Sequence, residues 1–232
     1  MAEIIQIDNN TWRIEDGFVR FFLLEGEEKA ALIDSGMNCP NAFDIAQNLT
    51  DKPVILINTH GDTDHTSGTN GFNNIYIHPL DYVECDVKNR YPNTAMIPLN
   101  DGDIIDLGGR PLKIIHIPGH TKGSVAILDI VKRVLYAGDS VQAGHIYMFG
   151  TKRCPELFEE SLDKLIGLKN EYDCIYASHD SFMVSNDYAE KVKMAWKHVQ
   201  SGEVSYEMID LFGNSVKSYT TSDCGFYMEA YD

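Results

Sequence analysis

The first third of the chain alternates short apolar-rich runs with turn signals. The runs EIIQI, TWRI, FVRFFLLE and KAALIDSG are separated by Asn-Asn, Asp-Gly and Gly-Glu, which predicts an antiparallel β-meander. In the next segment, CPNAFDIAQNLTD, apolar residues recur at three- and four-residue spacing and predict a helix. The apolar run PVILINT, bounded by Pro53 and a polar loop, predicts a buried strand.

The rest of the chain repeats this plan. A short helix after His65, the strand IYIHP and a helix near 79–88 precede the strand runs DIIDLGG, PLKIIHIPG, SVAILDI and RVLYAGD. An amphipathic helix is predicted over 155–168, a buried strand at CIYASHD and another helix over 186–200. The tail 203–232 predicts edge strands or irregular cover, and a homodimer contact through it stays open. This order predicts two sheets packed face to face with helices outside, in one domain over 1–232.

Composition and charge narrow the class of protein. The 232 residues are 44% hydrophobic, and no run of 18 apolar residues or basic, apolar leader is present, so we expect neither a membrane span nor a secretory signal. The formal net charge of −16 disfavours nucleic acids and anionic membrane surfaces as partners. The expected partner is a small-molecule substrate.

The number and spacing of the cysteines bear on the cellular compartment. The chain has five cysteines, an odd number, and contains no Cys-x-x-Cys. We therefore expect reduced thiols in a cytoplasmic protein, because disulfides persist mainly in oxidising compartments.

Histidines and aspartates follow the predicted strands where each strand ends. Four separate loops carry them, and loops anchored by a sheet commonly bring side chains together into a site. The candidates are His60, Asp62, Asp64 and His65 after VILIN, His120 after KIIHIPG, Asp139 after RVLYAG, and His179 after CIYAS. Together they could hold two metal ions that share a carboxylate.

The segment HGDTDH makes a metal the preferred explanation. A single histidine after a strand is usually an ordinary hydrogen-bonded residue, and we give His78, His116 and His198 that interpretation. In HGDTDH, by contrast, acidic and imidazole side chains crowd on alternate positions and call for a compensating cation.

These motifs resemble the metallo-β-lactamase-fold superfamily. The resemblance runs in order through ALIDSG, NTHGDTDHTSG, HIPGHTKGSVAI, YAGDS and ASHD, which covers nearly the whole chain. It implies an α/β fold of the α+β type, a four-layer αββα sandwich, which agrees with the predicted order of elements. It also implies a metal-dependent hydrolase similar to glyoxalase II, although no glutathione pocket is recognisable.

The resemblance also implies a ligand set. His60 and His120 would hold the first metal with a contribution from Asp62, while Asp64, His65 and His179 would hold the second and Asp139 would bridge the two. Asp34 matches a family aspartate that lies outside the ligand set. Two divalent ions are expected, with zinc first and iron or manganese as alternatives.

Asp62 departs from the family pattern. The common motif is H-x-H-x-D-H, whereas this chain has H-x-D-x-D-H. A carboxylate is a harder, anionic ligand and shifts metal preference towards iron or manganese. Three outcomes stay open: a dinuclear site with Asp62 as a ligand, a site filled mainly at the second metal, or a non-catalytic site. The flavodiiron branch carries a glutamate at this position together with a flavodoxin domain, and we expect no such domain after residue 200.

The site predicts hydrolysis. A metal-activated hydroxide, oriented by the catalytic Asp64, would cleave an ester, thioester, lactone or phosphodiester. In SVQAGHIYMFGTK, which follows Asp139, the residues His145, Tyr147 and Lys152 are candidate substrate contacts, although for any one of them a loop packing its own side chains is the favoured explanation. Only 39 residues lie between Asp139 and His179, which leaves no room for the insert of nucleic-acid-cleaving members, and β-lactamase activity is not favoured either. The alternative is a di-iron oxidoreductase or an oxygen- or nitric oxide-responsive protein, and a binding protein without turnover is a third possibility.

Overall fold

The computed structural model describes residues 2–83 and 85–230, which form three β-sheets and five α-helices. The first sheet contains, in spatial order, β1 (Glu3–Asp8), β2 (Thr11–Asp16), β3 (Val19–Glu25), β4 (Ala30–Ile33), β5 (Val54–Ile57), β6 (Asn74–Ile77) and β7 (Ala95–Pro98). The second contains β14 (Met183–Ser185), β13 (Cys174–Tyr176), β11 (Val134–Tyr136), β10 (Val125–Asp129), β9 (Pro111–His116) and β8 (Ile104–Asp106). The third contains β12 (His145–Met148), β17 (Gly225–Glu229), β16 (Asn214–Thr220) and β15 (Tyr206–Leu211).

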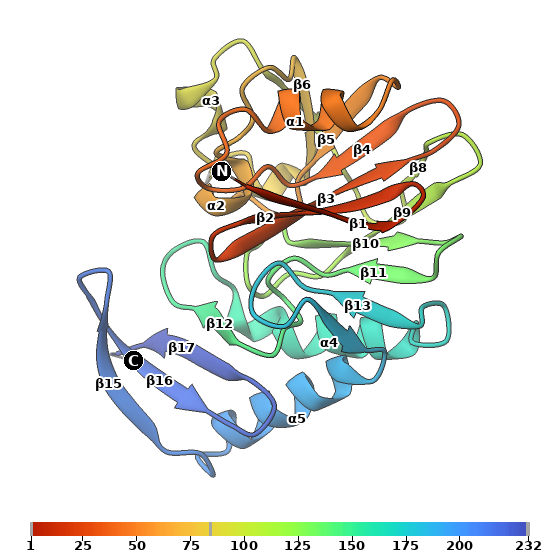
Figure 1. Cartoon of the computed structure of the whole chain (residues 1–232). Helices are drawn as coiled ribbons and strands as arrows, with labels where there is room; N and C mark the ends of the chain where they lie inside the picture. Colours follow the sequence, from red (N-terminus) through yellow and green to blue (C-terminus); the bar gives the residue numbers. More distant parts are fainter. Residues whose placement is uncertain (1, 84, 231–232) are drawn as a thin grey trace.

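Helices cover the outer faces of the two larger sheets (Figure 1). α1 (Ala42–Leu49) lies over the first sheet, and α4 (Phe158–Gly167) and α5 (Tyr188–Gln200) lie under the second. Two further helices, α2 (Thr63–Thr66) and α3 (Val87–Arg90), are single turns in loops, and 3₁₀ turns occupy Pro79–Asp81 and Pro155–Leu157. The four-layer αββα sandwich predicted from the sequence is confirmed.

Strand periodicity explains why the layers stack. On β3, Phe21 and Leu23 point into the core under α1, whereas Phe22 and Leu24 point into the core between the two sheets. This alternation follows from the two-residue period of a strand, and a strand buried on both faces is therefore apolar throughout. A third core lies between the second sheet and the helices α4 and α5. Three parallel apolar cores thus separate four layers.

Two sequence predictions need correction. The helix expected near 79–88 is instead the 3₁₀ turn Pro79–Asp81 followed by the single turn α3, because Asp81 is drawn into buried hydrogen bonds with two loops. Residue 84, which falls inside that expected helix, lies outside the described residues. The expectation of two sheets is incomplete, because β12 pairs in parallel with β17 from the tail to make a third sheet.

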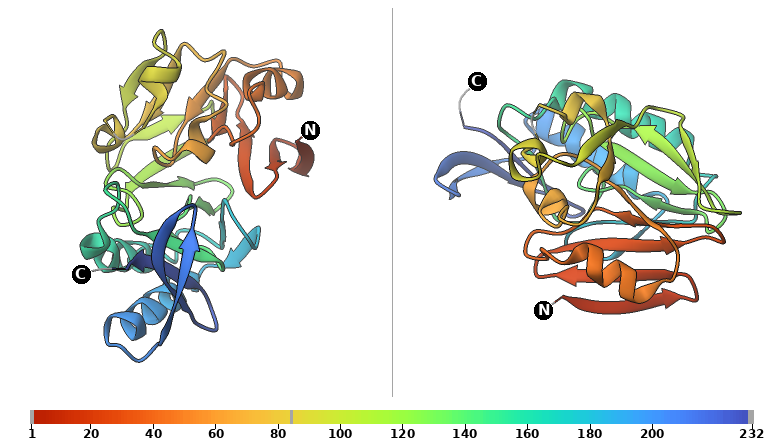
Figure 2. Two further views of the ribbon diagram at one scale, coloured as in Figure 1. Left: turned by 90° about the vertical axis from the view of Figure 1, so that its left-hand side faces the viewer. Right: turned by 90° about the horizontal axis from the view of Figure 1, so that it is seen from above.

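The third sheet stands at one side of the sandwich, and its β15–β16 hairpin extends from the body (Figures 1 and 2). Its core-facing residues, Ile146, Met148 and Phe226, join the apolar core that contains α4 and α5. In the part of the chain that the structure describes, no helix combines the length and apolar character that crossing a bilayer requires.

Candidate metal centre

Four loops at the carboxyl ends of strands supply the predicted ligands. The strands β5, β9, β11 and β13 precede the loops that carry His60, His120, Asp139 and His179, respectively. The structure brings all seven predicted ligands into two adjacent groups, and within each group one ligand atom per residue lies within 4.8 Å of the others. The groups are His60, Asp62 and His120, here called the first cluster, and Asp64, His65, Asp139 and His179, here called the second cluster.

The first cluster contains two imidazoles and one carboxylate. The Nε2 atoms of His60 and His120 lie 3.2 Å apart. The Oδ2 atom of Asp62 lies 3.3 Å from Nε2 of His120 and 3.6 Å from Nε2 of His60. Asp62 is thus close enough to act with the two histidines on one ion, although its side chain is shorter than the histidine of the common motif.

The second cluster contains two imidazoles and two carboxylates. Nε2 of His179 lies 3.3 Å from Oδ2 of Asp64 and 3.2 Å from Oδ2 of Asp139. Nε2 of His65 lies 3.1 Å from Oδ1 of Asp139. Oδ2 of Asp139 also lies 3.6 Å from Nε2 of His120, so this carboxylate stands between the two clusters.

The outer nitrogen of each ligand histidine is already engaged. Nδ1 of His65 contacts Asp34 Oδ2 at 2.8 Å, and Nδ1 of His179 contacts the carbonyl oxygen of Phe18 at 2.8 Å. Nδ1 of His120 lies 3.0 Å from the carbonyl oxygen of Tyr147, and Nδ1 of His60 lies 3.0 Å from a threonine hydroxyl. Such contacts fix the tautomer that leaves Nε2 free, as metal-binding histidines require.

Unsatisfied buried atoms support the same conclusion. Nε2 of His65 and Oδ1 of Asp139 are buried and lie 3.1 Å apart, yet neither atom makes a hydrogen bond within 2–83 and 85–230. Buried polar atoms are nearly always paired, so two idle atoms that face one another indicate a missing common partner. A divalent cation suits both atoms, because imidazole and carboxylate are its usual ligands. The residues present therefore fit a metal.

The protonation states of the first cluster leave its ligand atoms free. Burial lowers the pKa of His120 to about 4, and the positive charge of Arg153 acts in the same direction. Burial alone would raise the pKa of Asp62, but its close contacts with His120 and His60 and the charge of Arg153 bring it well below its ordinary value. At neutral pH His120 is therefore neutral and Asp62 is ionised.

The second cluster has the opposite character. Burial opposes the charged form of His179, yet the carboxylates of Asp139 and Asp64 raise its pKa to about 10. The pKa of His65 is likewise raised well above its ordinary value, because Asp139, Asp64 and Asp34 outweigh burial. These carboxylates demand positive charge nearby, which either protons or a divalent cation can supply.

Asp34 supports the second cluster from behind. Asp34 is buried, and besides His65 its side chain accepts hydrogen bonds from the backbone and hydroxyl of Thr59, each at 2.8 Å, and from Nδ2 of Asn58 at 3.4 Å. Its backbone is left-handed, with φ of 63°, a conformation that aspartate tolerates better than most residues. Asp34 thus lies outside both ligand clusters and orients one of them.

Asp81 plays the corresponding part for the first cluster, and the sequence did not indicate it. Its buried carboxylate accepts hydrogen bonds from the backbone of Gly61 at 2.8 Å, the hydroxyl of Thr121 at 2.9 Å and the backbone of Gly123 at 2.8 Å. These groups flank His60 and His120, so Asp81 ties the two loops together. An aspartate inside an expected helix, near 79–88, gives no sign of this role.

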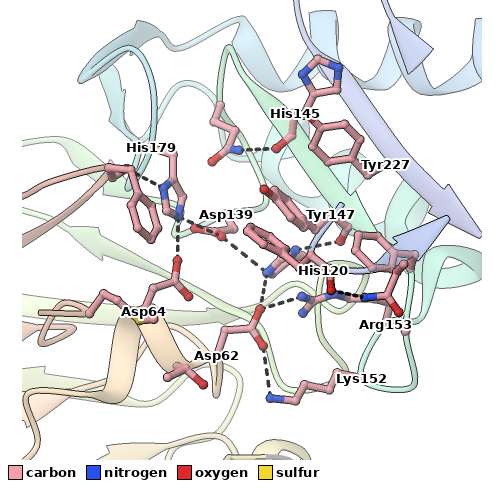
Figure 3. Close-up of a pocket in the computed structure, with 18 of the residues that line it drawn as sticks. Asp62, Asp64, His120, Asp139, His145, Tyr147, Lys152, Arg153, His179 and Tyr227 are labelled. Carbon is pink, nitrogen blue, oxygen red and sulfur yellow. Dashed lines mark hydrogen bonds and ion pairs between the residues drawn. The ribbon is translucent and has the colours of Figure 1, made fainter. Parts of the chain in front are cut away.

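Two basic residues contact Asp62 (Figure 3). Nη2 of Arg153 lies 2.7 Å from Oδ2 of Asp62, and Nζ of Lys152 lies 3.4 Å from its Oδ1. Lys152 was predicted as a substrate contact, whereas Arg153 was missed. Arg153 and Asp62 are 91 residues apart, so no local pattern in the sequence indicates their contact. The one indication that this segment lies near the site was the prediction of the adjacent Lys152 as a substrate contact.

Both clusters open into a cavity of about 930 Å³ (Figure 3). The predicted contacts His145, Tyr147 and Lys152 all line it. The His145 ring stacks on Tyr227 with centroids 4.4 Å apart, and Tyr147 packs edge-on against Tyr227 at 5.0 Å. Gly225 pairs with His145 across the sheet, and a Cβ there would lie 2.4 Å from the imidazole, so glycine permits this stacking.

The tail 203–232 contributes side chains to the wall of the cavity. Tyr227 and Phe212, both from the tail 203–232, line the cavity, and neither was predicted to do so. Phe212 forms the tip of the β15–β16 hairpin, is 83% exposed and has a φ of 54°, which is unusual for a bulky residue. The sequence left edge strands or irregular cover open for this tail, and it could not show that the β15–β16 hairpin and the strand β17 border a cavity.

Comparison with known proteins places the chain among metal-dependent enzymes. The family model of the metallo-beta-lactamase superfamily matches residues 14–179. The acyl-coenzyme A thioesterase MBLAC2 of Bos taurus is 23% identical over 167 residues, which is 54% of this chain and 59% of that protein. The hydroxyacylglutathione hydrolase of Hahella chejuensis is 29% identical over 202 residues, which is 83% of this chain and 71% of that protein.

Solved structures share the fold. A metallo-beta-lactamase from Pontibacter korlensis superposes with a TM-score of 0.71 at 14% identity, over 85% of this chain and 99% of that one. A metallo-beta-lactamase family protein from Thermus thermophilus gives a TM-score of 0.63 at 21% identity, over 79% and 75% of the two chains. At these identities the likeness concerns the architecture.

Proposed function

The chain belongs to the metallo-beta-lactamase superfamily, and on that premise we propose that it is a metal-dependent hydrolase of a small acyl thioester with a dinuclear site. The observation that carries this proposal is the meeting of two ligand clusters at one carboxylate, Asp139, on the wall of a large cavity.

The ligand atoms divide between two ions. His60, Asp62 and His120 would hold one ion, Asp64, His65 and His179 would hold the other, and Asp139 would contact both. Such ions lower the pKa of water and polarise a carbonyl oxygen, which is the chemistry that hydrolysis needs near neutral pH.

Asp64 is the residue best placed to handle the proton. Its side chain is the most exposed of the seven ligands, at 22%, and it borders the cavity. Burial raises its pKa, but the positive charge of His65 and a hydrogen bond from His179 lower it overall, so the carboxylate stays ionised. It can therefore accept a hydrogen bond from an attacking water, orient that water and pass its proton to the leaving group.

The cavity suits an acyl group with an apolar part. Three exposed apolar side chains from three separate segments reach it: Phe18 in the β2–β3 turn, Met37 after β4 and Phe212 at the hairpin tip. Exposed apolar groups gathered around one opening commonly mark a ligand site. The names of two relatives agree, because both describe release of an acyl group from a carrier, coenzyme A in one and glutathione in the other.

A substrate panel tests this proposal. Protein loaded with zinc, manganese or iron would be assayed on acyl-coenzyme A and hydroxyacylglutathione thioesters, lactones, simple oxygen esters and bis-nitrophenyl phosphate. We expect kcat/KM for a thioester to exceed that for the phosphodiester by at least about a hundredfold. Chelation should abolish turnover, and a preference for phosphodiesters or no turnover with any metal would refute the proposal.

The hairpin tip offers a second test of the acyl assignment. Phe212→Ser should lower kcat/KM for long acyl chains by about tenfold and leave acetyl thioesters nearly unchanged, because it removes one apolar contact worth about 1–3 kcal/mol. Met208→Ser, a matched change on the same hairpin at a residue that does not line the cavity, is the control. Equal losses for short and long chains would contradict an acyl-binding role.

A di-iron oxidoreductase or oxygen- or nitric oxide-responsive protein is the second candidate function. The observation that favours it is the first cluster, whose two histidines and one carboxylate form the donor set typical of non-haem iron. Metal analysis of protein purified without added zinc separates the two functions. Two iron ions per chain with a visible absorption band would favour the oxidoreductase, and colourless protein that hydrolyses thioesters would favour the hydrolase.

A further inference from the structure

The carboxylate that replaces the family's histidine has a counter-charge supplied by the chain. Arg153 places Nη2 2.7 Å from Oδ2 of Asp62, and this is the same oxygen that faces Nε2 of His120 at 3.3 Å. Oδ2 is therefore shared between the guanidinium and the position of the first metal. Lys152 contacts the other oxygen at 3.4 Å.

The environment of Arg153 shows that this contact dominates its placement. Its side chain is 11% exposed, and Nε and Nη1 are buried without a hydrogen-bond partner in the described part of the chain. A guanidinium buried with idle N–H groups is destabilising unless a carboxylate compensates its charge. Asp62 is the carboxylate that does so.

The two clusters consequently differ in charge. Asp62 adds one negative charge where the common motif has a neutral imidazole, and Arg153 adds one positive charge beside it. The first cluster and Arg153 together therefore have no net charge, the same as a cluster of three neutral imidazoles. When its histidines are neutral, as metal ligands are, the second cluster keeps both negative charges, because the ion pairs of Asp64 and Asp139 are with these ligand histidines and with no lysine or arginine.

We propose that Arg153 is a positioning residue that neutralises Asp62 and weakens the first cluster, so that the second cluster takes up its metal ion first. This inference rests on the metal centre of the proposed function. Arg153 repels a cation at the first cluster and withdraws electron density from Oδ2, whereas within the described residues no arginine or lysine forms an ion pair with Asp64 or Asp139 of the second cluster. The pair Asp62 and Arg153 thus replaces one histidine as a unit.

Zinc titration against a competing chelator tests the inference without measuring turnover. In a His65→Ala, His179→Ala background, which leaves the second cluster without an imidazole ligand, we expect Arg153→Met to tighten zinc binding at the first cluster by about tenfold or more, since it removes a charge beside a divalent ion. Arg133→Met makes the same change far from the site, where Arg133 pairs with Asp173, and should leave the affinity unchanged. Unchanged or weaker binding in Arg153→Met would overturn the inference.

Restoring the common histidine gives the sharper result. In the same background, Asp62→His should weaken zinc binding at the first cluster about tenfold, because it leaves Arg153 unpaired beside the ion. Combining Asp62→His with Arg153→Met should restore or exceed the zinc affinity that the first cluster has before either change. If Asp62→His alone tightens zinc binding, the two side chains are independent and the inference is wrong.

A variant that preserves the positive charge separates the effect of charge from the effect of misfolding. Arg153→Lys keeps the positive charge and should hold the zinc affinity near the parent value, whereas an affinity equal to that of Arg153→Met would exclude the charge explanation. Thermal melts of each metal-free variant show whether it is folded. Protein that binds zinc in this order but hydrolyses no substrate would refute the proposed function and leave the inference standing.

Discussion

The two halves of the metal centre share Asp139 but compensate charge in different ways. The first cluster pairs its own carboxylate with Arg153, and burial lowers the pKa of His120 to about 4. The second cluster has two carboxylates, Asp64 and Asp139, which raise the pKa of His179 to about 10 despite its burial. The first half is therefore close to electrical balance through Arg153, whereas the second half depends on protons on His65 and His179 until a cation replaces them.

This difference teaches that similar ligands need not make equivalent sites. Each cluster contains two histidines, yet their affinity for a cation depends on the groups one contact further out. Asp34 adds negative charge behind the second cluster, and Arg153 adds positive charge beside the first. Four substitutions and a change of pH should remove or sharpen this difference in charge between the two clusters.

Asp139→Asn should lower metal affinity at both clusters and so remove the difference between them, because Asp139 lies between the two. The variant loses the charge that faces His65, His120 and His179, so we expect both ions to bind at least about a hundredfold more weakly, more than the loss of an outer partner would cause. Elemental analysis after dialysis measures the two occupancies. Retention of both ions would show that Asp139 does not join the clusters.

Asp34→Asn and Asp81→Asn should separate the clusters. Asparagine tolerates the left-handed backbone of position 34, so the first change removes charge behind His65 and should weaken the second cluster about tenfold to a hundredfold. The second change loosens the loops of His60 and His120 and should weaken the first cluster similarly. Each should also cost about 3 kcal/mol of unfolding free energy, because a buried hydrogen-bonded charge is lost.

The matched pair of variants supplies its own control. Stepwise zinc titration and chemical denaturation of both proteins show which ion and how much stability each one loses. If the two variants weaken the same ion, the assignment of Asp34 to one cluster and Asp81 to the other is wrong.

The pH dependence of metal binding should differ between the clusters. Below about pH 10 His179 is protonated in the metal-free protein, so a metal must displace that proton and its affinity rises with pH. We expect about a tenfold rise per pH unit between about pH 6 and 8 at the second cluster, and more if His65 also releases its proton. His120 is already unprotonated there and adds no slope at the first cluster. Equal slopes for the two ions would contradict the assignment.

Lys152→Met should have the smallest effect. Lys152 lies farther from Asp62 than Arg153 does, at 3.4 Å against 2.7 Å, and its side chain is 30% exposed. Solvent screens such a charge, so we expect zinc affinity at the first cluster to rise only about twofold to threefold. Zinc titration with the competing chelator measures the difference. A change as large as that of Arg153→Met would mean that proximity and burial do not govern the effect.

The sequence predicted the parts of the molecule that rest on local pattern. Strand and helix periodicities gave the αββα order, because buried strands and amphipathic helices carry their own signature. The seven predicted ligands lie close together because each follows an apolar strand, and the fold gathers the carboxyl ends of β5, β9, β11 and β13 at one place. The superfamily was identified for the same reason.

What the sequence did not predict depends on contacts between distant segments. Arg153 meets Asp62 only after the loop that follows β12 folds over the first cluster. The helix expected near 79–88 included Asp81, although its buried hydrogen bonds to Gly61 and Gly123 decide its conformation. Phe212 reaches the cavity because β12 pairs with β17, a register that no local pattern specifies.

Anomalous diffraction from crystals soaked with zinc would test the central claim most directly. The account predicts two zinc peaks per chain, the stronger among Asp64, His65 and His179 and the weaker among His60, Asp62 and His120, with Asp139 in contact with both. Zinc absent from these side chains, or a single ion held by only one cluster at saturating zinc, would contradict it.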